Sequence, residues 1–189
     1  MAVTFTTSAG SAGGVQSSYA LELTAALEGQ FADIADNSVS TFVNETGAVV
    51  AYGNLVVVNA SGSVGNSAKT IAAANNTVVG INALTYVDET ATDTNSRPGV
   101  KDDQVMNVLS KGVVAVYCAE AVDLTSAVRV FHTDHNSTLS GARPGRFGKT
   151  AVQNKTAVLA GAHWVSKTSA AGIALLEING PDLSLTADT

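Results

Sequence analysis

The sequence predicts an all-β protein: an antiparallel β-barrel or a jelly-roll-like sandwich, with an extended N-terminal arm and at most one or two short helices. Val and Thr make up 45 of the 189 residues, and both fit a pleated, half-buried strand better than a helix. Short β-branched segments recur about every ten residues, separated by Gly, Asn and Asp, a spacing typical of all-β sandwiches and barrels. Little helical periodicity interrupts them.

The N-terminal part of the chain differs from the rest, so we expect an arm over residues 1–28 and a single β domain over residues 29–189. Residues 1–18 are small, polar and glycine-containing, and such a segment buries too little apolar area to fold alone. Its stabilising contacts should therefore come from a neighbouring subunit. The arm residues expected to make them are Phe5, Val15 and Tyr19.

A short helix is possible at the end of this arm. Tyr19, Leu23 and Leu27 recur with helical spacing, and Gly29 supplies a stop, which favours a helix over residues 18–28. The alternative is an extended arm that continues to Gln30.

The β-branched segments that follow are predicted strands. They cover residues 39–44, 48–52, 55–59, 69–73, 77–87, 104–109, 112–119, 127–133, 157–163 and 172–178. Two longer segments between them, residues 88–103 and 133–155, are polar and contain Gly and Pro. We expect these two to be surface loops, where functional residues often lie.

The composition narrows the possible partners. A net charge of −6 disfavours nucleic acid, because neutralising phosphate requires clustered Lys and Arg. The apolar runs are far shorter than the about 20 residues of a membrane span, and no signal peptide is recognisable. Only 14% of the residues are charged, against about 25% in ordinary domains, which suggests that a partner covers part of the surface. The lone Cys118 is expected to be a small buried hydrophobe.

The basic segment GARPGRFGKT, residues 141–150, ends like a phosphate-binding loop. The spacing does not fit that motif, because the position that requires Gly holds Arg143, and no strand-to-helix context surrounds it. What remains is a cluster of Arg143, Arg146 and Lys149 in a surface loop. It is either a solvated turn or a contact with carboxylates of a neighbouring subunit, which the Arg fork binds well.

Catalytic and metal chemistry find little support. His132, Asp134 and His135 lie close in sequence, but a metal site needs three or four converging ligands, and a strand would turn His135 away from the other two. The alternative is that these three residues lie at the edge of a surface loop and bind no metal. No nucleophile motif occurs, so we expect no enzyme activity and no cofactor.

Several stretches, taken in order, resemble the structural cement or head decoration proteins of tailed bacteriophages. They are GQFADIAD at residues 29–36, NSVSTFVNE at 37–45, GAVVAYGNLVVV at 47–58, KTIAAA and VVGI within 69–81, VMNVLSKGVVAVYC at 105–118 and VLAGAHWVSKTSAAGIALLEI at 158–178. The resemblance covers about residues 29–178. Neither the arm nor the loop that contains Arg143 maps onto it, so their roles rest on physical argument.

The resemblance implies a non-enzymatic virion protein on the outer face of the capsid, bound to the major capsid protein at or near threefold positions, as a homotrimer. The family has no catalytic residues to transfer. Two alternatives remain open: a tail or baseplate β-domain that forms rings, and a carbohydrate-binding module outside virions. A glycan array with Trp164→Ala would test the second.

Overall fold

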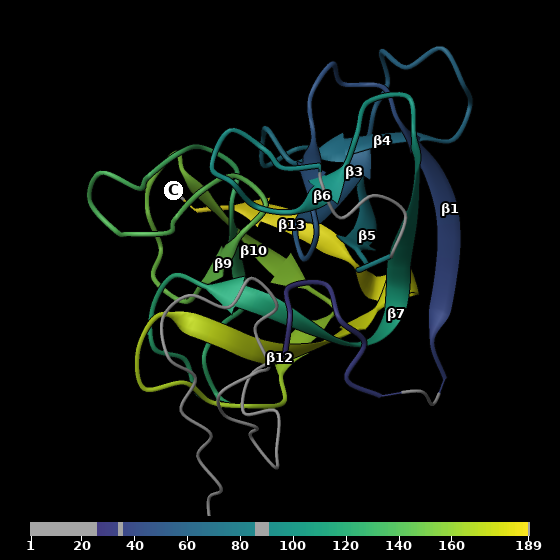
Figure 1. Cartoon of the computed structure of the whole chain (residues 1–189). Coiled ribbons are helices and arrows are strands. Elements are labelled where there is room, and N and C mark those ends of the chain that lie inside the picture. Colours follow the sequence, from purple (N-terminus) through teal and green to yellow (C-terminus); the bar gives the residue numbers. More distant parts are fainter. Residues whose placement is uncertain (1–25, 34–35, 86–90, 189) are drawn as a thin grey trace, which may run out of the picture.

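The computed structural model describes residues 26–33, 36–85 and 91–188. Within them the structure is almost entirely β, which confirms the predicted fold class (Figure 1). The elements are β1 (Ser38–Asn44), β2 (Val50–Ala51), β3 (Leu55–Val58), β4 (Ser67–Thr70), β5 (Val78–Asn82), β6 (Gly99–Val100), β7 (Val105–Cys118), β8 (Arg129–Phe131), β9 (Phe147–Gly148), β10 (Thr156–Ala160), β11 (Ala162–Trp164), β12 (Gly172–Asn179), the 3-10 helix η1 (Gly180–Asp182) and β13 (Ser184–Ala187). Phe5, Val15, Tyr19 and most of the expected helix over 18–28 lie outside the described residues.

The strands close into two barrel-like circuits that share β7. In the first barrel, β7 pairs with β1, β1 with β4, β4 with β3, β3 with β5, and β5 with β7 again. In the second barrel, β7 pairs with β12, β12 with β11, β10 with β8, β8 with β9, and β9 with β7. Only one residue separates β10 from β11. The pairing is mostly antiparallel as predicted, but β1–β4 and β7–β9 are parallel.

The strand β7 passes from one barrel into the other without a break. The expectation of two strands, over residues 104–109 and 112–119, is therefore wrong: they are one strand of 14 residues. Gly112 lies within it at φ +131, where a Cβ atom would come within 1.9 Å of Asn37 Oδ1. The glycine thus lets the strand turn and lets Asn37 pack against it, where any other residue would be strained.

Other departures from the predicted strands involve short or bent elements. The expected strand over residues 157–163 is divided at Gly161 (φ +74) into β10 and β11. The two-residue strands β6 and β9 lie inside the two segments predicted as loops. The strand β13 was not predicted, and it pairs with β10.

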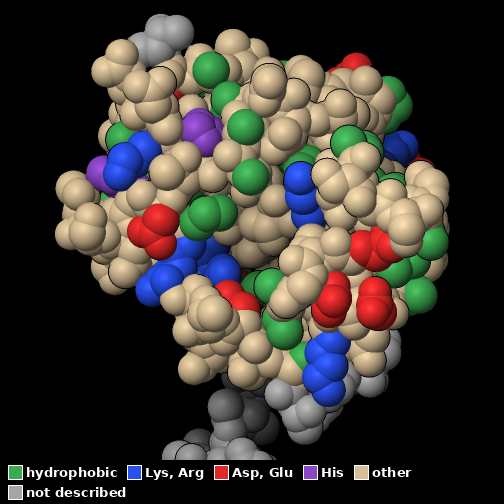
Figure 2. Space-filling view, turned by 90° about the horizontal axis from the view of Figure 1, so that it is seen from above, with side chains coloured by type: hydrophobic (Ala, Val, Ile, Leu, Met, Phe, Trp, Pro, Cys, Tyr) green, Lys and Arg blue, Asp and Glu red, His purple; other side chains and the backbone are tan. Residues whose placement is uncertain are grey.

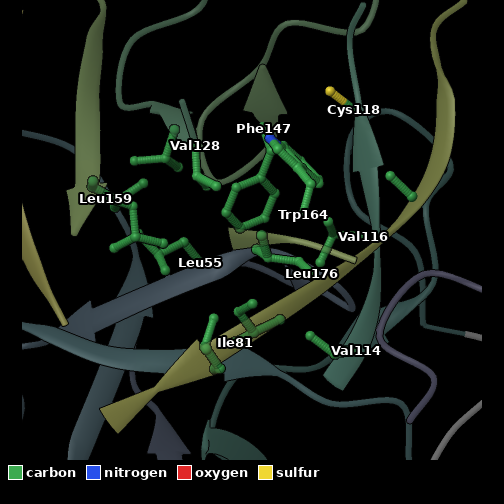
Figure 3. Packing of buried hydrophobic residues seen from close by; sticks show 14 of the residues in the cluster. Leu55, Ile81, Val114, Val116, Cys118, Val128, Phe147, Leu159, Trp164 and Leu176 are labelled. Atoms are coloured by element: carbon green, nitrogen blue, oxygen red, sulfur yellow. The ribbon is translucent and has the colours of Figure 1, made fainter. Parts of the chain in front are cut away.

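The main apolar core joins the inside of the second barrel to residues of the first, such as Leu55 of β3 and Ile81 of β5. Trp164 is 1% exposed and meets Phe147 edge to face, with ring centroids 6.4 Å apart. Figure 3 shows these two rings close to Leu176 and Val116. Cys118 is fully buried beside them, which confirms its predicted role, and burial raises the pKa of its thiol to about 11.

The first barrel has a smaller apolar core and buries amide side chains. Asn44 Nδ2 donates to the carbonyl oxygens of Ala48 and Val100, at 2.7 and 3.0 Å. Asn82 Nδ2 donates to the carbonyls of the β2 residues Val50 and Ala51, at 3.0 and 3.1 Å. These bonds satisfy main-chain groups that the short strand β2 leaves without a complete ladder.

Candidate functional site

The basic loop, residues 141–150, lies where the two barrels meet. Its backbone is fixed on both sides, because Gly145 N donates to Phe131 O of β8 and Gly145 O accepts from Leu55 N of β3, both at 2.9 Å. Gly145 adopts φ +86, and a Cβ atom there would lie 2.8 Å from the Asn54 side chain. The loop therefore presents its cations from a backbone held in place by both barrels.

Arg146 points inward and is buried. Its Nη2 lies 2.6 Å from Glu28 Oε1, and its guanidinium carbon lies 3.9 Å from the centroid of the Tyr117 ring. Burial raises the pKa of Glu28, and the nearby Arg146 offsets only part of that effect. Burial also lowers the pKa of Arg146. The pair therefore attaches residue 28 to the loop, and a contact of Arg146 with a neighbouring subunit stays a prediction.

Arg143 lies at the rim of a cleft of about 370 Å³. It donates through Nη1 to Asn95 Oδ1. Beside it in the cleft, Arg97 forms an ion pair with Asp93 at 2.6 Å and donates to Asn54 Oδ1 at 3.1 Å. Figure 2 shows a face of the molecule that is hollowed near its centre, with basic and acidic side chains close together beside the hollow.

The electrostatics of this cleft differ from those of the Glu28 pair. Burial alone would raise the pKa of Asp93, but hydrogen bonds from the backbone and side chain of Arg97 and from Asn95 outweigh it, so the pKa is lowered. Asp93 is thus held as an anion that neutralises Arg97. Among the described residues, Arg143 bonds to a neutral amide, that of Asn95, and not to a carboxylate, so its charge is available to a carboxylate from outside.

Lys149 is exposed and belongs to another hollow, of about 460 Å³, which Lys167 and Asp123 also line. The backbone there is fixed by Glu120, whose Oε1 accepts from Lys149 N and Thr150 N at 2.8 Å. Burial would raise the pKa of Glu120, but these bonds and the one from the Thr150 hydroxyl lower it overall. The three predicted cations are therefore not one patch, because each has different surroundings.

The sequence reasoning missed the acidic and amide partners of these cations. Asp93 and Arg97, four residues apart in a polar loop, were a usable local signal. No local signal pointed to Glu28, because 118 residues separate it from Arg146.

The His132 segment does not gather metal ligands. His132 Nδ1 lies 3.0 Å from Thr133 Oγ1, Asp134 Oδ1 accepts from Asn136 N, and the His135 ring stacks on Phe131. Nowhere in the described part of the chain do three or more His, Cys, Asp or Glu side chains converge as metal ligands would.

Two further observations concern carbohydrate binding and membrane-spanning helices. Trp164 is inside the core and offers no ring to a sugar, which removes the residue named for a carbohydrate-binding module. Across residues 26–33, 36–85 and 91–188, no apolar helix reaches membrane-spanning length.

The described residues thus form a β-structured protein of two fused barrels, with polar, charge-lined hollows where charged side chains are held on a fixed backbone. The chain belongs to the family described as "Structural cement protein (E217 gp24/Pam3 gp6)", which matches residues 15–179. The fold is similar to a chain of the structure "The capsid of Myoviridae Phage XM1", with a TM-score of 0.62 and 20% identity, over 87% of this chain and 97% of that one. No curated protein matches.

The family decides among the three functions that the sequence left open. The protein is a structural cement protein of a phage capsid, and the tail and carbohydrate-binding alternatives have no comparable support.

Proposed function

We propose that this cement protein binds the outer face of the phage head as a homotrimer, contacts the major capsid protein, and has no catalytic role. The observation that carries the proposal is the contrast within the basic loop. Arg146 is paired inside the chain, whereas Arg143 and Lys149 present charge outward from a backbone held by both barrels.

The composition supports a closed assembly. A chain with 46% hydrophobic and only 14% charged residues has more apolar area than one 19.1 kDa surface readily exposes. A symmetric homotrimer buries that surplus between copies. Light scattering on the purified protein and density at threefold positions of decorated heads test this; a monomer in both would contradict it.

The ionic contact is tested by binding to undecorated heads. Exposed ion pairs contribute only about 0–1 kcal/mol, whereas desolvated bidentate Arg contacts contribute several. We expect the double variant Arg143→Ala, Lys149→Ala to co-sediment at least about tenfold more weakly, equal to about 1.4 kcal/mol, at low salt. The difference should shrink at high salt.

The control is Lys69→Ala, which removes a cation that belongs to β4 and not to the basic loop. It should leave binding unchanged. Equal affinity of the double variant and wild type at both salt concentrations would show that the loop is a solvated turn.

Truncation tests the arm independently of the loop. Deleting residues 2–18 should leave the barrels folded and weaken attachment to heads, because Phe5 and Val15 would no longer contact a neighbour. Loss of folding would instead place this segment in the core.

A further inference from the structure

One edge of β1 is open. Figure 1 shows β1 at the margin of the molecule beside β7. Asn44 N bonds to Gln104 O at 2.9 Å, whereas Val43 N bonds to Asn66 O, next to β4, at 3.0 Å. Main-chain groups of even-numbered residues thus face β7, and those of odd-numbered residues face the other edge.

The strand β4 covers that other edge only at Val43 and Asn44. Upstream, the main-chain N–H groups of Val39 and Thr41 point away from β7, and no strand in the described part of the chain pairs there. The Asn66 side chain reaches Thr41 O at 3.0 Å. The open edge is thus the outer side of about five residues, 38–42, which continues the line of β4.

The open edge lacks the usual protection against pairing. Exposed edges normally carry Lys, Pro or inward-pointing charge, whereas β1 reads SVSTFVN and contains none of these. Ser38, Val39, Ser40 and Thr41 are exposed, and Val39 is 44% exposed. An uncharged, unprotected edge with an exposed apolar side chain is expected to be paired in the assembled protein.

The N-terminal sequence supplies a matching segment. Residues 3–7 read VTFTT, an alternation of apolar and β-branched polar residues that is typical of a strand. Added beside β1, such a strand would place Val3 and Phe5 on one face, where Phe5 packs on Val39. Residues 8–25 connect this segment to Ala26 and span up to about 60 Å when extended, enough to reach another copy.

We propose that residues 3–7 of one copy add as a β-strand to the open edge of β1 in a second copy. The inference rests on the proposed function, because a trimeric cement protein needs a link between its own copies. Each copy gives a strand and receives one, a head-to-tail contact that closes into a ring of three. The main chain supplies the affinity, and Phe5 on Val39 sets the register.

Photo-crosslinking tests this with the full chain. Phe5 is replaced by p-benzoylphenylalanine, and the purified protein and decorated heads are irradiated. We expect covalent dimers and trimers on denaturing gels, with peptide mapping placing the link within residues 38–42. Links inside one chain, to the major capsid protein or to another part of the second copy would overturn the proposal.

A backbone variant tests the edge itself. Val39→Pro removes an outward N–H and leaves the β7 ladder intact, because Pro is tolerated on that side of an edge strand. It should lower the crosslinking yield at least about tenfold. Val39→Thr, which keeps the N–H, should retain the yield, and equal yields for both variants would contradict strand addition.

Two measurements keep the outcomes separate. Circular dichroism checks folding of Val39→Pro, and if it does not fold, the crosslink map on unmodified β1 decides. Co-sedimentation with heads scores the proposed function independently. Head binding without a link to β1 refutes only the strand addition, whereas crosslinked trimers that do not bind heads refute only the capsid role.

Discussion

The two barrels that share β7 are stabilised in different ways. The second barrel buries Trp164 and Phe147 among aliphatic side chains, and its stability comes mainly from the hydrophobic effect. The first barrel has a smaller apolar cluster and uses Asn44 and Asn82 to bind carbonyl groups of short segments. Apolar packing tolerates substitutions of similar volume, whereas a buried amide fits only one arrangement of its partners.

The two proposed contact regions lie at different places relative to the barrels. The basic loop is at the seam, the region where the two barrels meet, and the open edge of β1 is on the first barrel. The basic loop is anchored to both barrels by Gly145, so its position depends on how the barrels sit on β7. The open edge of β1 belongs to the first barrel, where amide bonds rather than bulk packing fix the strands. Substitutions in the two barrels should therefore differ in size and in what they disturb.

The largest effect is expected in the second barrel. Trp164→Ala removes a side chain that is 1% exposed and leaves a cavity against Phe147. We expect a loss of about 3–5 kcal/mol in the free energy of unfolding, measured by denaturant titration. The neighbouring Val165→Ala, at a side chain that is 37% exposed, should lose less than about 1 kcal/mol. Similar losses for both would show that the aromatic core is not the main support.

The second effect concerns the point where β7 changes barrel. Gly112→Ala puts a Cβ atom at φ +131 and against the Asn37 amide, so we expect a loss of about 2–3 kcal/mol. Gly172→Ala is the matched control on β12, because a Cβ atom at Gly172 would have no other atom within 4 Å. Thermal unfolding should separate the two variants. A neutral Gly112→Ala would mean that the strand relaxes without strain.

A smaller effect is expected from the amide bonds of the first barrel. Asn82→Ala removes both donors to the carbonyls of Val50 and Ala51 and leaves those groups buried, which should cost about 2 kcal/mol. Hydrogen exchange should rise in β2 and β6 and remain unchanged in β12. The exposed Asn75→Ala is the control, and faster exchange throughout the chain would contradict separate support of the barrels.

The strands that local pattern predicts are those with their own β-branched run. β3, with the sequence LVVV, is an example, and β12 was predicted from its Ile and Leu residues. The apolar run around Cys118 likewise predicted that its side chain is buried. The two-residue strands β6 and β9 exist only because distant partners pair with them, so they leave no local pattern. The expected interruption at residues 110–111 was wrong, because β7 continues through them, and the positive φ of Gly112 lets the strand turn there without a gap.

The candidate site shows the same limit. Proximity in sequence suggested that Arg143, Arg146 and Lys149 act together, but tertiary packing gives them separate surroundings. The composition of a loop predicts that it carries charge. It does not predict which charge a distant residue such as Glu28 will neutralise.

The smallest effect, and the one that tests the seam most directly, is the pH dependence of the Glu28–Arg146 pair. Burial raises the pKa of Glu28 above its ordinary value of 4.5 despite the nearby Arg146. A raised pKa means that the folded protein binds the proton more tightly than the unfolded chain. The stability contributed by the protonated form is complete below the unfolded pKa and is lost as the pH rises through the folded pKa.

Glu28→Gln removes this titration and keeps the shape. The free energy of unfolding of Glu28→Gln minus that of wild type should therefore increase as the pH rises above the ordinary pKa of 4.5 and through the raised pKa of the folded protein. Glu120→Gln is the matched control with the opposite sign, because the hydrogen bonds from Thr150 and Lys149 outweigh burial and lower the pKa of Glu120. Its difference from wild type should decrease as the pH rises through the acid range up to about the ordinary pKa of 4.5 and stay flat above it, because ionised Glu120 stabilises the fold fully above its unfolded pKa and loses that stabilisation as the pH falls through its folded pKa. A difference for Glu28→Gln that falls as the pH rises to about 4.5 and stays flat above it, as expected for Glu120→Gln, would show that burial does not dominate at Glu28 and that the pair stabilises the region where the barrels meet by net attraction.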